Sequence, residues 1–483
     1  MATLDQVIEH ITMFVASRGD VPGAVIGDEL RKRFPDFDYH GEGFRNLTDL
    51  LDRNAPALSI VGRSGLDFLW SSGPADLATP VEDLPIDEDE LASARRVFPD
   101  LTGDEIHFDS VRFRNFKSLA DVEVPLHRLT ILVGANGVGK TSVLEGIFLL
   151  GQLRNKKPGT VFASRREPGR MRTVDASGFM EVRIEDSATD CSAALEIQWP
   201  EERYESIPRH VVRVTRGDER LEYDFSRPIP EGQLALRQTP MFQAFGWTSH
   251  LKHNARAIAR ASYSEKDTPS LRYDGLGLPS VLAHLAATDR SRLDAIIKAV
   301  HRVIPGVEDV RMPRAEVHYT EQRVVVVDGE EIRRRAATSR WGNALEVKLH
   351  GHWLPADLLS EGTLLTLGLM AAIHGPQSPP RMLLIDDIDQ ALHPNAQRRQ
   401  IEQLVEIQEM HPSLQIVCTT HSPYVLDVVD AECVRVMRMT RDGKASCRRL
   451  IDHKDWNEWK ESMSAGEFWS FVGEDWLEDD RAS

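Results

Sequence analysis

Residues 129–150 read LTILVGANGVGKTSVLEGIFLL. The apolar run from Leu129 to Val133 predicts a short buried strand, and the helical spacing of apolar residues after Ser142 predicts a helix. Between them, residues 134–141 match the pattern G-x-x-x-x-G-K-[ST]. In this order of strand, loop and helix, backbone N–H groups and a helix N-terminus can bind phosphate oxygens. The stretch therefore predicts an α/β nucleotide-binding fold.

The residues of this loop are expected to have different roles. We expect Lys140 to reach the β- and γ-phosphates of ATP as a catalytic residue, and the Thr141 hydroxyl to ligate Mg²⁺. A glycine-rich turn without a ligand is the alternative, and the full match in its proper context argues against it. The expected nucleotide-binding residues are Gly134, Ala135, Asn136, Gly137, Val138, Gly139, Lys140, Thr141 and Ser142.

A second apolar run, from Met382 to Ile385, ends in Asp386-Asp387. A buried parallel strand that ends in an acid places a carboxylate at the edge of the sheet where the phosphate loop lies. We expect Asp386 to hold Mg²⁺ through water and Asp387 to be the catalytic base that orients the attacking water. Two acids at a solvated strand end are common, so these roles depend on the neighbouring motifs.

Four segments, taken together, resemble the ABC-like AAA ATPases of the RecF, SMC and OLD type, some of which act in phage defence. Residues 111–147 resemble the opening of these proteins, and residues 358–373 (LLSEGTLLTLGLMAAI) resemble their ABC signature. Residues 383–394 (LLIDDIDQALHP) and 415–427 (QIVCTTHSPYVLD) are similar to the later motifs. The four segments follow the order that the family has.

This resemblance implies a site shared by two copies of the chain. In residues 359–362 (LSEG), which stand where the family has L-S-x-G, Ser360 with the backbone of Glu361 and Gly362 would bind the γ-phosphate of ATP held by the other copy. The product would be an ATP-sandwiched homodimer, or a higher oligomer. His421 would sense the γ-phosphate as a third catalytic residue.

Two details depart from the family pattern. Asp387 stands where the family usually has glutamate, and one missing methylene moves the carboxylate at a position sensitive to ångström shifts. We therefore expect slow turnover. Gln152 follows Lys140 too closely to be the glutamine of the loop after the first helix, so that residue stays unassigned.

The resemblance also implies that the loop at 391–394 lies at the dimer interface.

The chain predicts four regions. Residues 1–72 resemble a LOTUS (OST-HTH) winged helix, and residues 73–104 form an acidic linker. Residues 105–455 form the ABC-like ATPase domain, with an insertion at about 155–345, and residues 456–483 form an acidic, aromatic tail. The predicted fold class is thus α/β, a P-loop NTPase with an ABC-type head, a β-lobe and a helical insertion, preceded by a small winged-helix domain.

Within the insertion, the sequence pattern predicts short strands over 180–240 and helices over 278–304. We interpret these as a β-lobe followed by a short helical lobe or hairpin. The insertion contains two basic stretches, which read either as solvated faces or as a surface that follows phosphates. Their residues are Arg154, Lys156, Lys157, Arg165, Arg166, Arg170 and Arg172, and Arg333, Arg334, Arg335 and Arg340.

The sequences of the two ends of the chain do not single out one kind of binding partner. Residues 1–72 hold seven Lys and Arg against eleven Asp and Glu, and a winged helix with two strands near 58–61 and 68–70 fits RNA, DNA or protein about equally. The tail reads as a strap on the ATPase core or as a docking strip for a partner protein.

The composition of the chain indicates which partners and which cellular compartment to expect. The formal net charge of −17 lowers the expectation of nucleic-acid binding, which must come from local patches. No apolar run is long enough for a membrane span, and the N-terminus lacks the pattern of a signal peptide. The four scattered cysteines (Cys191, Cys418, Cys433 and Cys447) favour a reducing compartment. We therefore expect a cytoplasmic protein without a membrane partner.

The predicted function is that of an ATPase whose head closure controls a bound nucleic acid or an effector protein, such as a nuclease, in anti-phage defence. The chain itself shows no nuclease constellation. Two alternatives stay open. One is a RecF-like DNA-repair ATPase, and the other is an RNA- or protein-binding LOTUS scaffold in which ATP is only structural.

Overall fold

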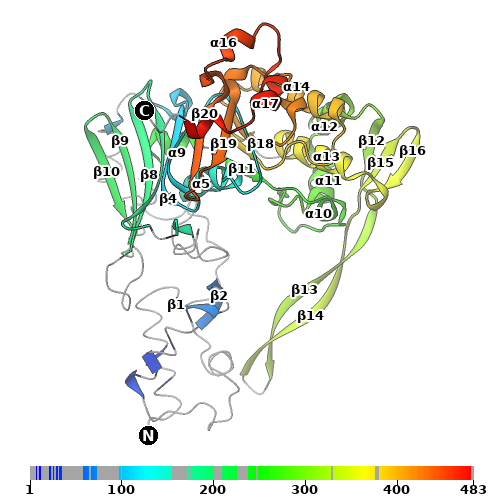
Figure 1. Cartoon of the computed structure of the whole chain (residues 1–483). Helices are drawn as coiled ribbons and strands as arrows, with labels where there is room; N and C mark the ends of the chain where they lie inside the picture. The colour runs from blue at the N-terminus through cyan, green and yellow to red at the C-terminus, as the bar shows by residue number, and fades with distance from the viewer. Residues whose placement is uncertain are drawn as a thin grey trace.

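The computed structural model places the phosphate loop between two six-stranded sheets (Figure 1). It describes residues 101–154, 176–199, 209–225, 238–245, 248–327, 330–375 and 380–479, without the side chains of 320–337, and shorter stretches that include 21–22, 58–64, 67–72 and 171–174.

The central sheet has the strand order β11-β17-β18-β6-β19-β20. Its first five strands run parallel, and β20 is antiparallel to β19. The strands β6, β17 and β18 are buried along their whole length, as the mostly apolar strands of a sheet covered on both faces are. The bounds are β6 Leu129–Gly134, β11 Thr248–Leu251, β17 Met382–Ile385, β18 Gln415–Thr419, β19 Val434–Met439 and β20 Ala445–Arg449.

Each face of the central sheet has its own hydrophobic core, because successive side chains of a strand point to opposite faces. Ile131 and Val133 of β6 pack into one core with α13 (Glu361–His374) and α14 (Pro394–Met410). Leu132 packs into the other core with α5 (Lys140–Leu153) and the second sheet.

The second sheet is the β-lobe, and every pair of neighbouring strands in its order β10-β9-β8-β7-β4-β5 is antiparallel. It confirms short strands in the described part of the range 180–240 for which they were predicted. Phe113 of β4 meets α5 where Gly146 leaves room for the ring. The bounds are β4 Ser110–Phe116, β5 Leu119–Pro125, β7 Met180–Asp186, β8 Cys191–Gln198, β9 Arg209–Arg216 and β10 Glu219–Asp224. The short helix α9 (Pro240–Phe245) packs beside this sheet.

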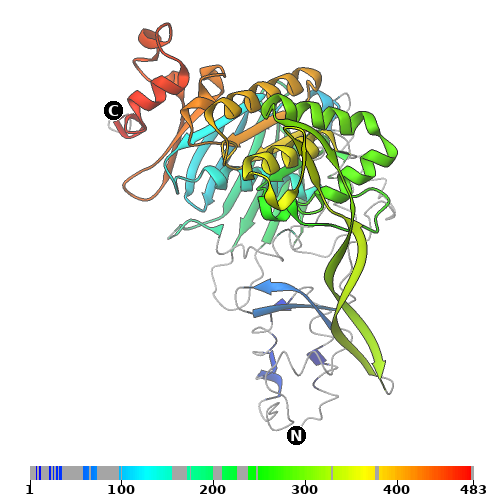
Figure 2. The ribbon, with the colours of Figure 1, turned by 90° about the vertical axis from the view of Figure 1, so that its right-hand side faces the viewer.

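The insertion contains the expected helical lobe and also a β-hairpin that was not predicted. The helices α11 (Leu278–Thr288) and α12 (Arg290–Val303) confirm the predicted helical stretch, and α10 (Ala255–Ala259) precedes them. The strands β13 (Arg314–Val327) and β14 (Glu330–Asn343) form a long antiparallel hairpin that projects from the head (Figures 1 and 2). Its base adjoins a small sheet of β12 (Val307–Arg311), β15 (Glu346–Leu349) and β16 (His352–Pro355).

The head therefore has the predicted α/β P-loop ATPase fold with a β-lobe and a helical insertion. One strand lies elsewhere than the insertion range suggests, because β11 belongs to the central sheet and pairs with β17.

The N-terminal region is described in part. The strands β2 (Leu58–Ser64) and β3 (Asp67–Ser72) form the expected hairpin, and β1 (Val21–Pro22) pairs with β3. Most of the expected helices, and the linker over 73–96, lie outside the described residues. The LOTUS-like assignment and the domain boundaries therefore stay predictions.

The described part of the tail, up to residue 479, packs on the ATPase core as a strap. Its helices are α16 (Trp456–Trp459), α17 (Ala465–Val472) and α18 (Trp476–Asp479), and α17 lies against α15 (Pro423–Leu426), two residues after His421. Phe468 is fully buried, and the Ser464 hydroxyl donates to an Asp427 carboxylate oxygen at 2.7 Å.

None of the described helices is both long and apolar enough to cross a bilayer.

The junction of β6 and β19 gives a test of this fold. Gly134 has φ +142°, and a Cβ there would lie 2.1 Å from the Met437 carbonyl oxygen of β19. We expect Gly134→Ala to lower the free energy of unfolding by about 3 kcal/mol, because the new methyl group must separate the two strands. Urea unfolding measures this loss.

Gly137→Ala is the matched control, because Gly137 also has a positive φ (+81°) but a Cβ there meets nothing within 4 Å. It should cost about 1 kcal/mol, the strain of a left-handed backbone alone. Equal losses in the two variants would contradict the described strand contact.

Candidate functional site

The phosphate loop, residues 134–141, begins at the last residue of β6 and ends at the second residue of α5. Gly137 and Gly139 adopt positive φ angles of 81° and 102°, which a side chain would strain, so the pattern has glycine at both positions. The Lys140 ammonium donates to the carbonyl oxygens of Gly134 at 2.8 Å and Ala135 at 2.9 Å. Burial lowers the pKa of Lys140, against the raising effect of Asp387 and Asp386.

Asp386 is the buried centre of the site. Its side chain is 2% exposed, and it accepts hydrogen bonds from the Thr141 hydroxyl at 2.9 and 3.1 Å and from the Thr419 hydroxyl at 2.9 Å. The Lys252 ammonium donates to its Oδ2 at 2.9 Å. Burial by itself would raise the pKa of Asp386, but these partners, above all Lys252, outweigh it and lower the pKa. The carboxylate is therefore ionised.

Asp387 differs from Asp386 in its backbone conformation and in the direction in which its pKa is shifted. Its φ is +53°, and its N–H donates to the Thr419 hydroxyl at 2.8 Å. The residue is exposed. Desolvation at this site raises the pKa of Asp387, and the negative charges of Asp386 and Asp389 raise it further. A raised pKa makes a carboxylate a better proton acceptor when it is ionised, which is the property a water-orienting base needs.

The segment with His421 lies beside these acids. Asp389 accepts a hydrogen bond from the Thr420 hydroxyl at 2.6 Å and one from the His421 N–H at 3.4 Å. The His421 side chain is exposed. The structure thus brings His421 to the same edge of the sheet as Asp386 and Asp387, as expected for neighbouring parallel strands.

The signature segment starts α13. Ser360 is the N-cap of this helix, and its hydroxyl accepts from the Thr363 N–H at 3.2 Å. The Glu361 carboxylate accepts from the Gln390 amide at 3.2 Å. A Cβ at Gly362 would lie 2.5 Å from the Ala391 carbonyl oxygen, so only glycine permits this approach. Ser360 and Glu361 are exposed, so this helix N-terminus faces solvent.

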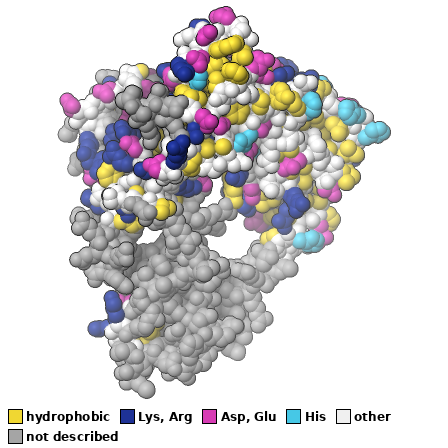
Figure 3. Space-filling model, viewed as in Figure 1, with side chains coloured by type: hydrophobic (Ala, Val, Ile, Leu, Met, Phe, Trp, Pro, Cys, Tyr) yellow, Lys and Arg dark blue, Asp and Glu magenta, His cyan; other side chains and the backbone are white. Residues whose placement is uncertain are grey.

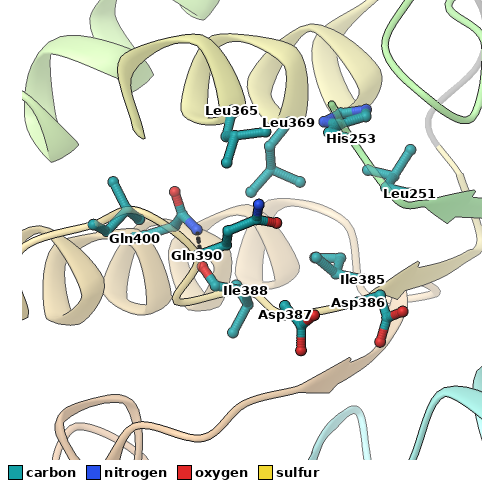
Figure 4. A pocket seen from close by; sticks show the side chains of 11 residues that line it. Leu251, His253, Leu365, Leu369, Ile385, Asp386, Asp387, Ile388, Gln390 and Gln400 are labelled. Carbon is teal, nitrogen blue, oxygen red and sulfur yellow. Dashed lines mark hydrogen bonds between the residues drawn. The ribbon is translucent and has the colours of Figure 1, made fainter. Parts of the chain in front are cut away.

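A small cavity connects the acids with α13 (Figure 4). Leu365, Leu369 and His253 line one side, and Asp386 and Asp387 lie on the other. The Nε2 atom of His253 is buried and has no hydrogen-bond partner among the described residues. Burial lowers the pKa of His253 to about 4, so the ring is neutral near pH 7.

Three residues of this site were not predicted. Thr419 and Asp389 lie inside quoted motifs, and their roles required the pairing of β17 with β18. Lys252 follows a four-residue edge strand, Thr-Ser-His-Leu, whose polar composition gives no strand signal. Gln152 lies in the last turn of α5, which agrees with leaving it out of the site.

The predicted basic stretches are only partly described. Arg340 contacts Tyr319, Tyr263 and Glu265 at the base of the hairpin. Most of the first stretch and the side chains of Arg333, Arg334 and Arg335 lie outside the described residues. Figure 3 shows Lys and Arg side chains over the β-lobe. In that lobe Arg213 pairs with Glu196 and Glu222, and Arg209 pairs with Asp224.

The residues present fit a magnesium ion. A hydroxyl oxygen and a carboxylate oxygen converge where Thr141 meets Asp386, and both are ligands that Mg²⁺ prefers. Among the described residues no group of three or more His, Cys, Asp and Glu could hold a metal. A site with one carboxylate suits Mg²⁺, which usually takes its other ligands from water and substrate phosphates.

Comparison with protein families identifies the segment that holds this site. The model of the family described as "AAA domain, putative AbiEii toxin, Type IV TA system" matches residues 129–427. The matched range is more than half of the chain, and it begins at β6 and ends just after α15.

The individual proteins that match this chain have low sequence identity to it. An OLD nuclease of Thermus scotoductus is 23% identical over 357 residues, which are 69% of this chain and 62% of that protein, so less than two thirds of the relative is matched. The SMC head bound to the C-terminal winged-helix domain of ScpA is 16% identical over 73% of this chain and 99% of its own, with a TM-score of 0.44. The SMC head domain of Thermotoga maritima is 15% identical over 71% and 99%, with a TM-score of 0.36.

Proposed function

Because this chain belongs to the AAA-domain family whose model matches residues 129–427, we propose that it binds Mg·ATP and hydrolyses it between two copies of itself. One observation carries the proposal. The Thr141 hydroxyl at the end of the phosphate loop lies 2.9 Å from the buried Asp386 carboxylate, although 245 residues separate them in the chain. This contact supports the proposal, because the ends of two parallel strands would join a phosphate site to a metal site.

The residues would divide the work by position. The backbone of residues 134–141 binds the phosphates, and the Lys140 ammonium leaves the loop carbonyls for the β- and γ-phosphates. Mg²⁺, held by Thr141 and by Asp386, would neutralise charge on the transferred phosphoryl group. Asp387 orients the attacking water, and His421 contacts the γ-phosphate.

The second copy would complete the site through α13. Ser360 caps an exposed helix N-terminus, which attracts anions, and Leu358 nearby is 67% exposed. An anion-binding helix end beside an exposed apolar side chain suits a surface that closes on the nucleotide of a partner. A two-fold dimer would then have two composite sites, each with Lys140 from one copy and Ser360 from the other.

Mixing two inactive variants tests the shared site. Lys140→Ala should abolish nucleotide binding, and Ser360→Arg should block closure on the partner's nucleotide. Each variant alone should be inactive. In an equimolar mixture about half of the dimers are mixed and have one intact site of two, so about a quarter of wild-type ATPase activity should return.

The readout is phosphate release at a fixed total concentration of protein. A mixture as inactive as its components, with mixed dimers demonstrated by differently tagged copies, would refute the shared site. Full nucleotide hydrolysis by isolated monomers would refute it as well.

Removing the Asp387 charge tests the proposed base. Asp387→Asn should keep ATP affinity, lower hydrolysis by about 10²–10³-fold, and accumulate an ATP-bound dimer, because the amide cannot accept the proton of the water. Single-turnover hydrolysis and light scattering after size exclusion measure the two effects. Asp430→Asn, an exposed acid away from the site, is the charge-matched control. Wild-type turnover in Asp387→Asn would show that another group is the base.

We further propose that head closure controls a nucleic acid or an effector protein, such as a nuclease, in anti-phage defence. The description of the family as a toxin–antitoxin component and the name of the OLD nuclease support this setting.

The ligand of the head can be identified from what accelerates hydrolysis. For an effector-controlling ATPase we expect a co-encoded protein, or phage-infected extract, to raise the ATPase rate several-fold. A DNA-repair role predicts instead that gapped or double-stranded DNA alone does so. Lys140→Ala is the blank for each rate. Absence of turnover under every stimulus would leave a scaffold with structural ATP.

A further inference from the structure

Lys252 makes a contact that the proposed chemistry does not use. It is the first residue after β11, and its ammonium donates to Oδ2 of Asp386 at 2.9 Å. The Lys252 side chain is 61% exposed, whereas that of Asp386 is 2% exposed. An exposed cation thus covers a buried anion from the solvent side.

The pairing follows from the central sheet. β11 runs parallel to β17, with Leu251 opposite Ile385, so the residue after each strand lies at the same edge. The Asp386 N–H donates to the Leu251 carbonyl oxygen at 3.1 Å, which fixes the two chain segments together. Lys252 is therefore held beside Asp386 by backbone pairing, and only its flexible side chain is free to move.

The four bonds to Asp386 occupy both of its oxygens. Oδ1 accepts from Thr141 and Thr419, and Oδ2 accepts from Lys252 and, at 3.1 Å, from Thr141. A divalent cation, or its bound water, that approaches Asp386 must displace one of the hydrogen-bond donors from these oxygens. Lys252 is the partner whose departure leaves no buried group unpaired, because its ammonium can return to water.

We propose that Lys252 is a displaceable counter-ion that makes divalent-cation binding at Asp386 depend on the nucleotide. Without nucleotide, the ammonium satisfies the buried carboxylate and opposes a second cation. When nucleotide phosphates enter beside Thr141, their negative charge draws Lys252 away from Asp386 and supplies the further ligands of the cation. This inference rests on the proposed function, since it takes Asp386 as the metal carboxylate.

Manganese binding to the full-length chain tests the idea without measuring turnover. Mn²⁺ serves as the probe, and its electron paramagnetic resonance signal gives free and bound ion with no nucleotide and with a non-hydrolysable ATP analogue. Wild type should bind Mn²⁺ weakly alone and tightly with the analogue. Lys252→Gln should bind Mn²⁺ alone about tenfold more tightly, because one charge-assisted hydrogen bond no longer competes.

The controls separate charge from position. Lys252→Arg keeps the cation and should keep wild-type behaviour. Lys298→Gln removes the same charge from an exposed position on α12 and should change nothing. Thermal unfolding checks that Lys252→Gln is folded, and Lys252→Ala replaces it if it is not.

Asp386→Asn distinguishes this inference from the proposed function. If it loses Mn²⁺ in both conditions while Lys252→Gln shows no gain without nucleotide, the counter-ion role is wrong and the metal site stands. If Asp386→Asn binds Mn²⁺ as wild type does, the metal assignment itself fails.

Discussion

The contact between Thr141 and Asp386 is the constraint on which the candidate site depends. It joins the phosphate loop after β6 to the residue after β17. Thr419, at the end of β18, donates a second hydrogen bond to the same carboxylate. A carboxylate buried to this degree is tolerated only when its oxygens are satisfied. The ends of β17 and β18 and the phosphate loop after β6 therefore have to keep their relative positions for the protein to fold with this site.

This constraint explains why the sheet is parallel and covered on both faces. Parallel strands present all their carboxyl ends at one edge, where residues distant in sequence can meet. The cost is that both faces must be packed, and the two cores provide this with α13 and α14 on one side and with α5 and the β-lobe on the other. The β-lobe thus supports the phosphate loop through Phe113, which packs on α5 at Gly146.

The sequence predicts the parts of this site that recur in short, ordered patterns. The phosphate loop and the acids after β17 follow uninterrupted apolar runs, which are the strongest strand signals available. Lys252 follows a polar edge strand, and its role appears only when β11 pairs with β17. The long hairpin carries a local signal, Asp328-Gly329 after four valines, which is typical of a tight β-turn.

The close approach of Gly362 to Ala391 has a consequence for how two sites could communicate. Because a Cβ at Gly362 would lie 2.5 Å from the Ala391 carbonyl oxygen, the backbone of α13 packs directly on the loop after Asp387, and a shift of α13 would be transmitted to that loop. In a two-fold assembly, Ser360 of a copy would serve one nucleotide and Asp387 of that copy the other. Closure at the first nucleotide would then reposition the water-orienting carboxylate at the second, which is a structural basis for cooperativity between them.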